Sequence, residues 1–564
     1  MINSILYNEL IKLPFIRDNV ERQKLLEVQQ EQSSILQFLL RSYSLQIPSI
    51  DTTSIQIPNN PHELLKELIE REEELLVVYQ SLPYFITTTY HQYVNRLIYL
   101  QKWQVEVLDQ LRNQLQTEEI WETHAVPKNQ KDFWIDEGYE LELVTSGLTF
   151  PSSIVFDDVG ELYAGEAGFS YGPAAAKAQI IHVKKNGETE VIASGFDRPL
   201  TGLTWHEGYF YVVTGDFNGR VYRVSKGGHK EVLVEGLRGG GDHYTSDIAF
   251  GPDGKMYFAV GTATNSGVVG RDNLMMGWLG RNEDYHDVPA RDLVLKGKNY
   301  KTANFLTKKE TDDKAYTGAY QPFRVPSTAG EIVEGQLYAN GVIYRANPDG
   351  SNLEIIADGL RNTFGLGFSP NGKLFITSNG LDFRGSRPIE GDWDPFYEVF
   401  PGWYGWPDFG SGLPVTLPYF KPPGHSQPDF VLAQHPPIAA QPLIRFAPHT
   451  ATLKFDFSTN SHFSTAGDIF FAQFGDQSPM TGLTPEPRGY RIVRVNPETG
   501  QIRDFLVNKT PGEKGNGPER PIAPRFSPDG KELYIVDFGV MEVAEGVIYP
   551  YAETGAVWKV RRKK

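Results

Sequence analysis

Apolar strands alternate with tight polar turns through most of the chain after residue 150. Three clear copies cover residues 248–258, 366–376 and 524–534, each with a Pro-Asp-Gly or Pro-Asn-Gly turn. Glycine supplies the positive φ that such a hairpin turn needs. Looser copies cover residues 154–163, 203–211 and 453–471, and third-strand patterns follow at 180–183, 219–224, 341–345, 490–495 and 555–560. Repeated units at unequal spacing predict the blades of a β-propeller with insertions.

Residues 1–118 follow a different pattern and contain no glycine. Apolar residues recur there at spacings of three and four, within residues 25–40, 64–76 and 84–116, which is typical of amphipathic helices. Asn60 and Pro61 suit the N-cap and first turn of the second helix. The pattern predicts an N-terminal all-α helical bundle over residues 1–120 and a linker over 121–134.

The bundle faintly resembles a ferritin-like domain in helix length and in its run of glutamates near residue 72. A di-iron site of that kind needs a glutamate three residues before each histidine ligand. Neither His62 nor His91 has one. We therefore expect a structural or docking role for the bundle, or self-association, and no chemistry.

The predicted propeller covers residues 135–564 and contains a long insertion at about 265–334 that is rich in charged and aromatic residues. Such an insertion is typical of a lid or a rim segment. The last strand, around Val557, is expected to pair with residues 140–144. This pairing would close the ring and leave no exposed sheet edge.

Composition excludes several classes of function. The net charge of -16, with no basic stripe, argues against a nucleic-acid partner. The absence of cysteine excludes disulfides, thiol catalysis and cysteine-ligated zinc. We find no run of about 18 apolar residues, so no transmembrane segment is expected, and the first residues do not have the pattern of a signal peptide. A cytoplasmic location and one at a cell or spore surface both stay open.

Three segments carry more specific information: residues 241–254, 359–368 and 378–382, followed by a Gly-Trp-Tyr-Gly-Trp-Pro run at 402–407. In order and spacing they resemble the soluble glucose/sorbosone dehydrogenase family, across roughly residues 135–562. Members of that family are six-bladed propellers that oxidise sugars with pyrroloquinoline quinone (PQQ). The resemblance implies the same all-β six-bladed fold. It also implies oxidation of a sugar or a related hydroxyl or aldehyde at the mouth of the channel.

The resemblance also implies roles for individual residues. His243 falls where the family places its general base, a task that suits imidazole because its pKa lies near neutrality. Arg361 and Asn362 fall on the pair that contacts the cofactor, and Arg520 on a further cofactor arginine. A guanidinium can both hold a carboxylate and polarise a quinone oxygen. Arg198 is expected to replace a glutamine that the family has nearby.

A calcium site is implied as well. Gly380 and Leu381 fall where backbone carbonyls hold the ion that bridges the cofactor, and Asp382 is a candidate additional ligand. Two cationic positions of the family are lost: residues 472–476 contain no lysine, and Ile522 stands where a second arginine is expected. Because PQQ carries three carboxylates, their loss predicts weakened PQQ binding.

Two other functions stay open at this point. A calcium-dependent lactonase-like hydrolase would use the same propeller, with Asp247 and Asn362 as candidate ligands for a channel calcium, and would need no quinone. A non-catalytic carbohydrate-binding or scaffold propeller would explain both the lost cations and the fused bundle, and it predicts that His243 is dispensable.

Overall fold

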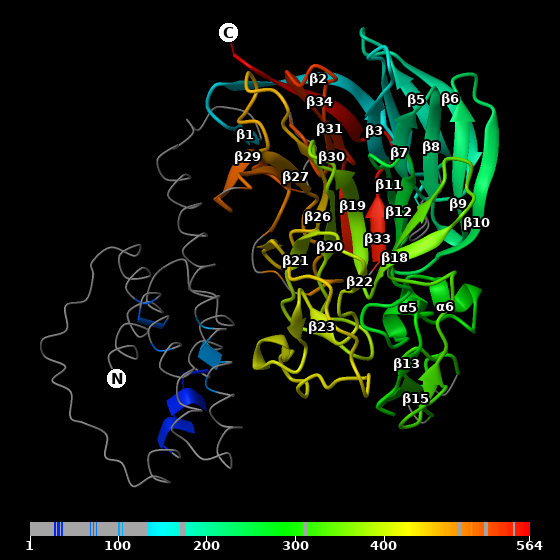
Figure 1. Cartoon of the computed structure of the whole chain (residues 1–564), viewed down its shortest axis with the longest axis vertical. Helices are drawn as coiled ribbons and strands as arrows, with labels where there is room; N and C mark the ends of the chain where they lie inside the picture. Colours follow the sequence, from blue (N-terminus) through cyan, green and yellow to red (C-terminus); the bar gives the residue numbers. More distant parts are fainter. Residues whose placement is uncertain are drawn as a thin grey trace, which may run out of the picture. The chain divides into compact units, whose positions relative to one another are not determined.

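A computed structural model of the chain is drawn in Figure 1. It describes residues 133–563 apart from 170–175, 308–312, 483, 485, 486, 498, 512–516, 545 and 546, together with isolated positions between 28 and 104. The chain forms two compact units, Met1–Lys128 and Asn129–Lys564. No helix within the described residues is long and apolar enough to cross a membrane.

The helical bundle predicted for residues 1–120 and the linker after it lie almost entirely outside the described residues. The described positions in this range are helical. Among them Gln101 accepts a hydrogen bond from Nε2 of Gln32 at 3.0 Å and donates one to the backbone oxygen of Glu72 at 2.8 Å. These two hydrogen bonds join three described helical positions that lie far apart in the sequence, while a bundle with a docking role stays a prediction.

The second unit is a ring of six blades, each with four antiparallel strands in order from the inside outward, and this confirms the six-bladed prediction. The first three blades are β3 (Pro151–Phe156), β4 (Leu162–Glu166), β5 (Ala178–Val183) and β6 (Thr189–Phe196); β7 (Leu200–His206), β8 (Tyr209–Thr214), β9 (Asp216–Ser225) and β10 (Lys230–Gly239); and β11 (Thr245–Phe250), β12 (Met256–Val260), β17 (Val342–Ala346) and β18 (Glu354–Asp358). The last three are β19 (Asn362–Phe368), β20 (Leu374–Asn379), β21 (Asp394–Glu398) and β25 (Ile444–Phe446); β26 (Thr452–Phe457), β27 (Ile469–Gln473), β28 (Arg491–Val495) and β29 (Ile502–Asn508); and β30 (Pro521–Phe526), β31 (Glu532–Asp537), β34 (Gly555–Arg562) and β2 (Tyr139–Leu148). A short fifth strand extends two of the blades: β22 (Gly402–Trp403) pairs with β18, and β1 (Phe133–Ile135) pairs with β29.

Each repeated phrase of the sequence forms the inner hairpin of one blade. The inner strands β3, β7, β11, β19, β26 and β30 contact one another in this order, and β30 contacts β3. The second strands β4, β12 and β27 are buried along their whole length, because a blade packs against each of their faces. The apolar residues of the repeat thus serve the packing between blades.

The ring closes as the sequence predicts. The C-terminal strand β34 lies between β31 and β2, with Thr145 opposite Val557 and Glu140 opposite Arg561. The outermost strand of the last blade therefore comes from the start of the propeller. This pairing removes the free edges that an open ring would have.

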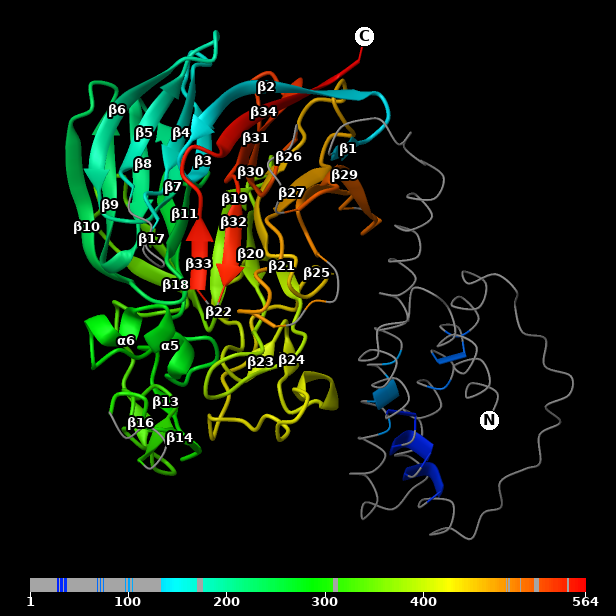
Figure 2. The same cartoon turned by 180° about the vertical axis from the view of Figure 1, so that it is seen from behind.

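Two long excursions leave the blades at the same end of the propeller (Figures 1 and 2). The first lies between β12 and β17 and contains α5 (Arg271–Met275), α6 (Trp278–Arg281), β13 (Leu293–Val294), β14 (Asn299–Ala303), β15 (Lys314–Gly318) and β16 (Ile332–Val333). The second lies between β21 and β25 and contains β22 (Gly402–Trp403), β23 (Phe409–Gly410), β24 (Leu413–Pro414) and the short 3₁₀ helix η4 (Pro418–Phe420). A hairpin of β32 (Met541–Ala544) and β33 (Val547–Pro550) precedes the last strand.

Candidate functional site

A cavity of about 170 Å³, which we call the central cavity, lies where the inner strands begin and the second strands end. All six blades contribute to its wall. Residues that precede β11, β19 and β26 line it, as do residues that follow β4, β20, β27 and β31. His243, Arg361, Asn362, Gly380 and Asp382 all line this cavity, so the fold brings these five predicted site residues together.

His243 is held in place by the backbone on either side of it. Its N–H donates to the Thr262 carbonyl at 3.1 Å, and the Thr262 N–H donates to the Arg361 carbonyl at 2.9 Å. A β-carbon at position 261 would overlap that of His243, so this close approach requires Gly261. The backbone at Thr262 thus lies between the backbones at His243 and Arg361, and it places His243 beside Arg361.

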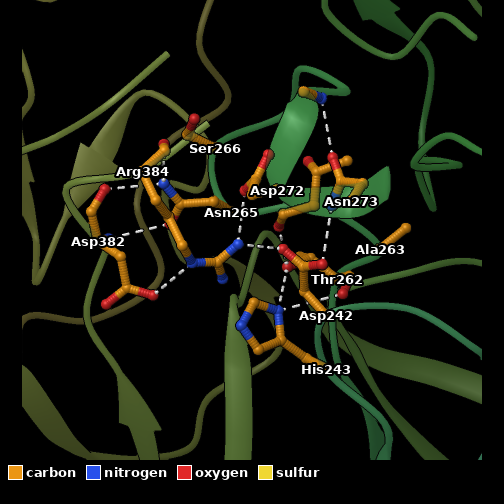
Figure 3. A network of polar contacts seen from close by, with 12 residues as sticks. Asp242, His243, Thr262, Ala263, Asn265, Ser266, Asp272, Asn273, Asp382 and Arg384 are labelled. Atoms are coloured by element: carbon orange, nitrogen blue, oxygen red, sulfur yellow. Dashed lines mark hydrogen bonds and ion pairs between the residues drawn. The ribbon is translucent and has the colours of Figure 1, made fainter. Parts of the chain in front are cut away.

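The hydrogen bonds of the His243 ring determine its tautomer. Nδ1 lies 2.8 Å from Oγ1 of Thr262 and 3.1 Å from the Thr262 carbonyl (Figure 3). The Thr262 hydroxyl donates its own proton to the Thr264 carbonyl at 2.7 Å, so it can only accept from the ring. Nδ1 therefore carries the proton, and Nε2 keeps its lone pair.

The surroundings of His243 keep the ring neutral. Burial lowers the pKa of His243 well below the ordinary value, and the positive charges of Arg361 and Arg384 lower it further. Among the described residues, none forms a hydrogen bond with Nε2. The cavity wall thus carries a neutral imidazole with an available basic nitrogen, which is the state that a general base needs.

Arg361 is tied to an aspartate and an asparagine. Its Nη2 donates to Oδ2 of Asp382 at 2.6 Å and to Oδ1 of Asn265 at 2.8 Å. Arg384 approaches the same Asp382 oxygen through Nε at 3.1 Å. Burial acts to raise the pKa of Asp382, but the two guanidinium groups bring it below its usual value. Asp382 is therefore ionised, and it already forms ion pairs with two cations.

Arg384 joins the first excursion to the propeller (Figure 3). Its Nη1 contacts Oδ2 of Asp242 at 2.6 Å and Oδ2 of Asp272, in α5, at 2.7 Å. Asn273, also in α5, donates to the other Asp242 oxygen at 2.8 Å. Burial acts to lower the pKa of Arg384, but its carboxylate partners hold it well above the ordinary value.

Two amides line the cavity next to these charges. Nδ2 of Asn362 donates to Oδ1 of Asn379 at 2.9 Å, and Nδ2 of Asn379 donates to the Thr452 carbonyl at 3.0 Å. Both side chains are half-buried. The side-chain oxygen of Asn362 accepts no hydrogen bond from a described residue, so it can accept one from a hydroxyl group of a ligand.

Arg520 and Arg198 are not brought to the cavity. Arg520 is buried, and its Nη1 donates to the carbonyls of Gly475 and Asp476 at 3.3 and 3.2 Å, while its guanidinium stacks on Tyr490. It holds the loop after β27. Arg198 is exposed at the start of the second blade. The two contacts to cofactor that the resemblance implies for them have no support in this arrangement.

Two aspartates that sequence analysis did not single out accept hydrogen bonds from the backbone at the predicted calcium site. The Gly380 N–H donates to Oδ1 of Asp394 at 3.0 Å, and the Leu381 N–H donates to Oδ2 of Asp392 at 2.8 Å. Burial raises the pKa of Asp392 to about 7 and that of Asp394 to about 6. No cluster of three or more histidine or acidic side chains that could hold a metal ion occurs within the described part of the chain.

His449 is a second histidine in the cavity wall, and it was not predicted either. It lines the central cavity with a φ of 66°, a left-handed conformation that is uncommon outside glycine. Burial lowers the pKa of His449 below its ordinary value. The loop before β26 carries it, and no local sequence pattern indicates which side chain of such a loop faces a cavity.

Negative charge prevails in the cavity wall. The described lining residues include two arginines, Arg361 and Arg384, and five aspartates: Asp242, Asp382, Asp392, Asp394 and Asp476. Both arginines are engaged in ion pairs. Burial raises the pKa of Asp242 to about 6 even though Arg384 opposes the shift. The site thus has more carboxyl groups than cations to balance them.

A buried lysine ties the inner strands together next to the cavity. Nζ of Lys454, in β26, donates to Oγ of Ser153 at 2.9 Å, to the Thr201 carbonyl at 2.6 Å and to Oδ1 of Asp247 at 3.0 Å. The other Asp247 oxygen accepts from the Leu366 N–H at 3.2 Å. Five of the six inner strands therefore meet at one ion pair.

No family model matches the chain, and no curated protein matches it. Similar solved structures include the holo form of the PQQ domain of pyranose dehydrogenase from Coprinopsis cinerea, with 16% identity, a TM-score of 0.47 and coverage of 77% of this chain and 98% of that one. A putative oxidoreductase (glucose dehydrogenase) from Thermus thermophilus has 18% identity, a TM-score of 0.45 and coverage of 75% and 100%. The PQQ-bound aldose sugar dehydrogenase from Streptomyces coelicolor has 15% identity, a TM-score of 0.43 and coverage of 76% and 100%.

Proposed function

We propose that this chain oxidises a hydroxyl group of a sugar or a sugar-like substrate in the central cavity, with His243 as the general base. One observation carries the proposal: the His243 ring is neutral, its Nδ1 proton is committed to Thr262, and its Nε2 is available on the cavity wall. The sequence motifs that resemble sugar dehydrogenases point to the same residue and the same reaction.

The residues can supply the proton-transfer half of this reaction. Oxidation of a CH–OH group to C=O removes one proton from oxygen and one hydride from carbon. Nε2 of His243 accepts the proton, while Asn362 and Arg361 are placed to orient neighbouring hydroxyl groups. Phe169, Phe364 and Phe474 add apolar wall against which a sugar ring can pack.

In the family that the sequence motifs resemble, PQQ is the two-electron acceptor when it is bound. The cavity residues do not fit that group as a trianion. Three carboxylates need cationic partners, whereas the described lining residues offer two arginines that already pair with aspartates. Arg361 and Asn362 can donate hydrogen bonds to a quinone oxygen. No residue of the described wall offers the three carboxylates a cation that is not already paired.

Calcium remains a prediction that rests on the backbone carbonyls of Gly380 and Leu381. Gly380 lines the cavity. Asp382, the third candidate ligand, instead forms ion pairs with Arg361 and Arg384. The hydrolase alternative meets a similar difficulty, because Asp247 is paired with Lys454 and does not line the cavity. Asp247 and Asn362 thus do not form a channel metal site in this arrangement.

Product analysis distinguishes the proposed activity from the alternatives. The full-length protein is incubated with a panel of aldoses and polyols together with PQQ and calcium, uncharged quinones or a redox dye, and separately with sugar lactones. We expect a substrate-dependent carbonyl, lactone or acid product and stoichiometric reduction of an acceptor. Lactone hydrolysis without acceptor reduction would replace the proposal with the hydrolase, and binding of sugars without any turnover would leave a carbohydrate-binding propeller.

A further inference from the structure

A larger hollow adjoins the central cavity beside the first excursion, and we call it the outer groove. Its volume is about 580 Å³, and it shares Met276, Arg384 and Met480 with the cavity wall. The central cavity alone, at about 170 Å³, is smaller than the roughly 300–1,000 Å³ that small-molecule pockets occupy. A ligand of ordinary size therefore extends from the cavity into the groove.

The outer groove is mainly apolar. Met275, Phe305, Phe383 and Pro479 line it in addition to the shared methionines. Phe305 is fixed by stacking on Phe323 with ring centroids 4.0 Å apart, and Met275 is 45% exposed. Its acidic residue, Asp272, is paired with Arg384. Two arginines also line the groove, the exposed Arg271 and Arg384, which is the partner of Asp272. The stretch between the methionines and phenylalanines suits an apolar part of a ligand.

The central cavity places a second condition on the ligand. Five aspartates face two ion-paired arginines in its described wall, so an added carboxylate meets repulsion and no uncommitted cation. A ligand that fills both spaces is consequently uncharged in the cavity and apolar in the groove. Within the cavity, Arg361 and Asn362 can still donate to or orient a carbonyl oxygen.

We infer that the electron acceptor of this site is an uncharged quinone whose apolar substituent lies in the outer groove, rather than a tricarboxylate. This inference rests on the proposed function and names its second reactant. The reaction is balanced: the substrate CH–OH becomes C=O, its hydride passes to the quinone, and the proton taken by His243 completes the hydroquinone. No further oxidant is required for a single turnover.

Equilibrium binding tests the inference without relying on activity. Dissociation constants are measured by isothermal titration calorimetry for three probes: decylubiquinone, the same quinone head without a tail, and PQQ with and without calcium. We expect decylubiquinone to bind most tightly, with the tailless quinone weaker by roughly tenfold or more because apolar contact is lost. Binding of PQQ more tightly than decylubiquinone would overturn the inference.

Two hypotheses for Asp382, as the ion-pair partner of the arginines or as a calcium ligand, predict opposite effects of Asp382→Asn on PQQ binding. The amide keeps the size of the side chain but removes a negative charge and releases Arg361 and Arg384. We expect PQQ to bind roughly tenfold or more tightly to this variant, and decylubiquinone, which has no carboxylate, to gain much less. If Asp382 is instead a ligand of a cofactor-bridging calcium, PQQ with calcium binds more weakly, and that result would contradict the inference.

A groove variant provides an independent test should Asp382→Asn fail to fold. Met275→Glu places a charge in the outer groove at an exposed position, and Leu143→Glu is the matched control, since Leu143 is 48% exposed on the outer strand β2. We expect Met275→Glu to weaken decylubiquinone at least tenfold and leave the tailless quinone unchanged. Equal weakening of both probes, or none of either, would count against a tail in the groove.

The outcomes separate this inference from the proposed function. Tight decylubiquinone binding without its reduction by any sugar contradicts the proposed function but leaves the ligand assignment standing. Sugar oxidation that proceeds only with PQQ contradicts the inference and supports the function. Absence of quinone binding at the solubility limit contradicts the inference whatever the activity.

Discussion

Replacement of His243 by asparagine is expected to lower kcat/KM for substrate oxidation by about 10²- to 10⁴-fold, the usual contribution of a positioned general base. The amide nitrogen of asparagine can still donate to Thr262 as Nδ1 does, so the loop keeps its hydrogen bond while the basic nitrogen is lost. Steady-state kinetics with the substrate and acceptor found for the wild type measure the loss.

His229→Asn is the control for this variant, because His229 is exposed in a turn of the second blade and does not line the cavity. We expect wild-type kinetics for it. Quinone affinity should change far less than kcat/KM in His243→Asn, since the lost nitrogen acts in the proton transfer. If His243→Asn retains more than about a third of the wild-type kcat/KM, another group accepts the proton.

Lys454→Met is expected to cause the largest loss of stability, about 3–5 kcal/mol in the free energy of unfolding, because it leaves Asp247 buried without its cation. The side chains of both residues are nearly inaccessible, at 7% and 8% exposure. The lost lysine also leaves the Thr201 carbonyl and the Ser153 hydroxyl without this donor. Chemical denaturation followed by circular dichroism measures the change.

Two further variants isolate the effect of the buried charge. Lys373→Met removes a lysine whose side chain is 53% exposed and pairs with Glu398, so it should cost at most about 1 kcal/mol. Combining Lys454→Met with Asp247→Asn removes both charges and should recover part of the loss. A Lys454→Met protein as stable as Lys373→Met would show that the ion pair at the inner strands does not hold the ring together.

Much of the fold is readable from local sequence patterns. The inner hairpins carry their turn chemistry and their apolar alternation within about ten residues, so the sequence indicates all six. The third strand of the fourth blade, β21, escaped detection because it contains Pro395 and is followed by the long second excursion before β25. Closure between β2 and β34 was predictable since the ends of a propeller have few other partners.

The site was predictable only in part. His243, Arg361, Asn362, Gly380 and Asp382 belong to motifs that resemble a family, and the fold places all five at one cavity. Arg520 and Arg198 were predicted from the same resemblance, but neither lines this cavity. The Asp392, Asp394 and His449 side chains enter the wall from loops whose geometry depends on distant blades, and no local pattern encodes it.

The charge balance of the cavity also depends on contacts that a sequence does not display. Arg361 and Arg384 look like available cations along the chain, but Asp382 and Asp242 occupy them in three dimensions. Similarly, the pairing of Asp247 with Lys454 joins residues 207 positions apart. Such long-range pairs decide which charges a ligand meets.

The most direct test of the central claim is a nitrogen-15 NMR titration of the histidine side chains, with His243 assigned by its absence from the His243→Asn spectrum. The hydrogen bonds to Thr262 predict an Nδ1-protonated, Nε2-unprotonated ring, and the lowered pKa predicts that it stays neutral as the pH falls through the ordinary histidine value of 6.5. Addition of a substrate sugar should shift its Nε2 resonance, as expected for a hydrogen bond from the reacting hydroxyl. A ring that titrates at the ordinary histidine value, or that does not respond to any sugar which the protein oxidises, would contradict the assignment of His243 as the base.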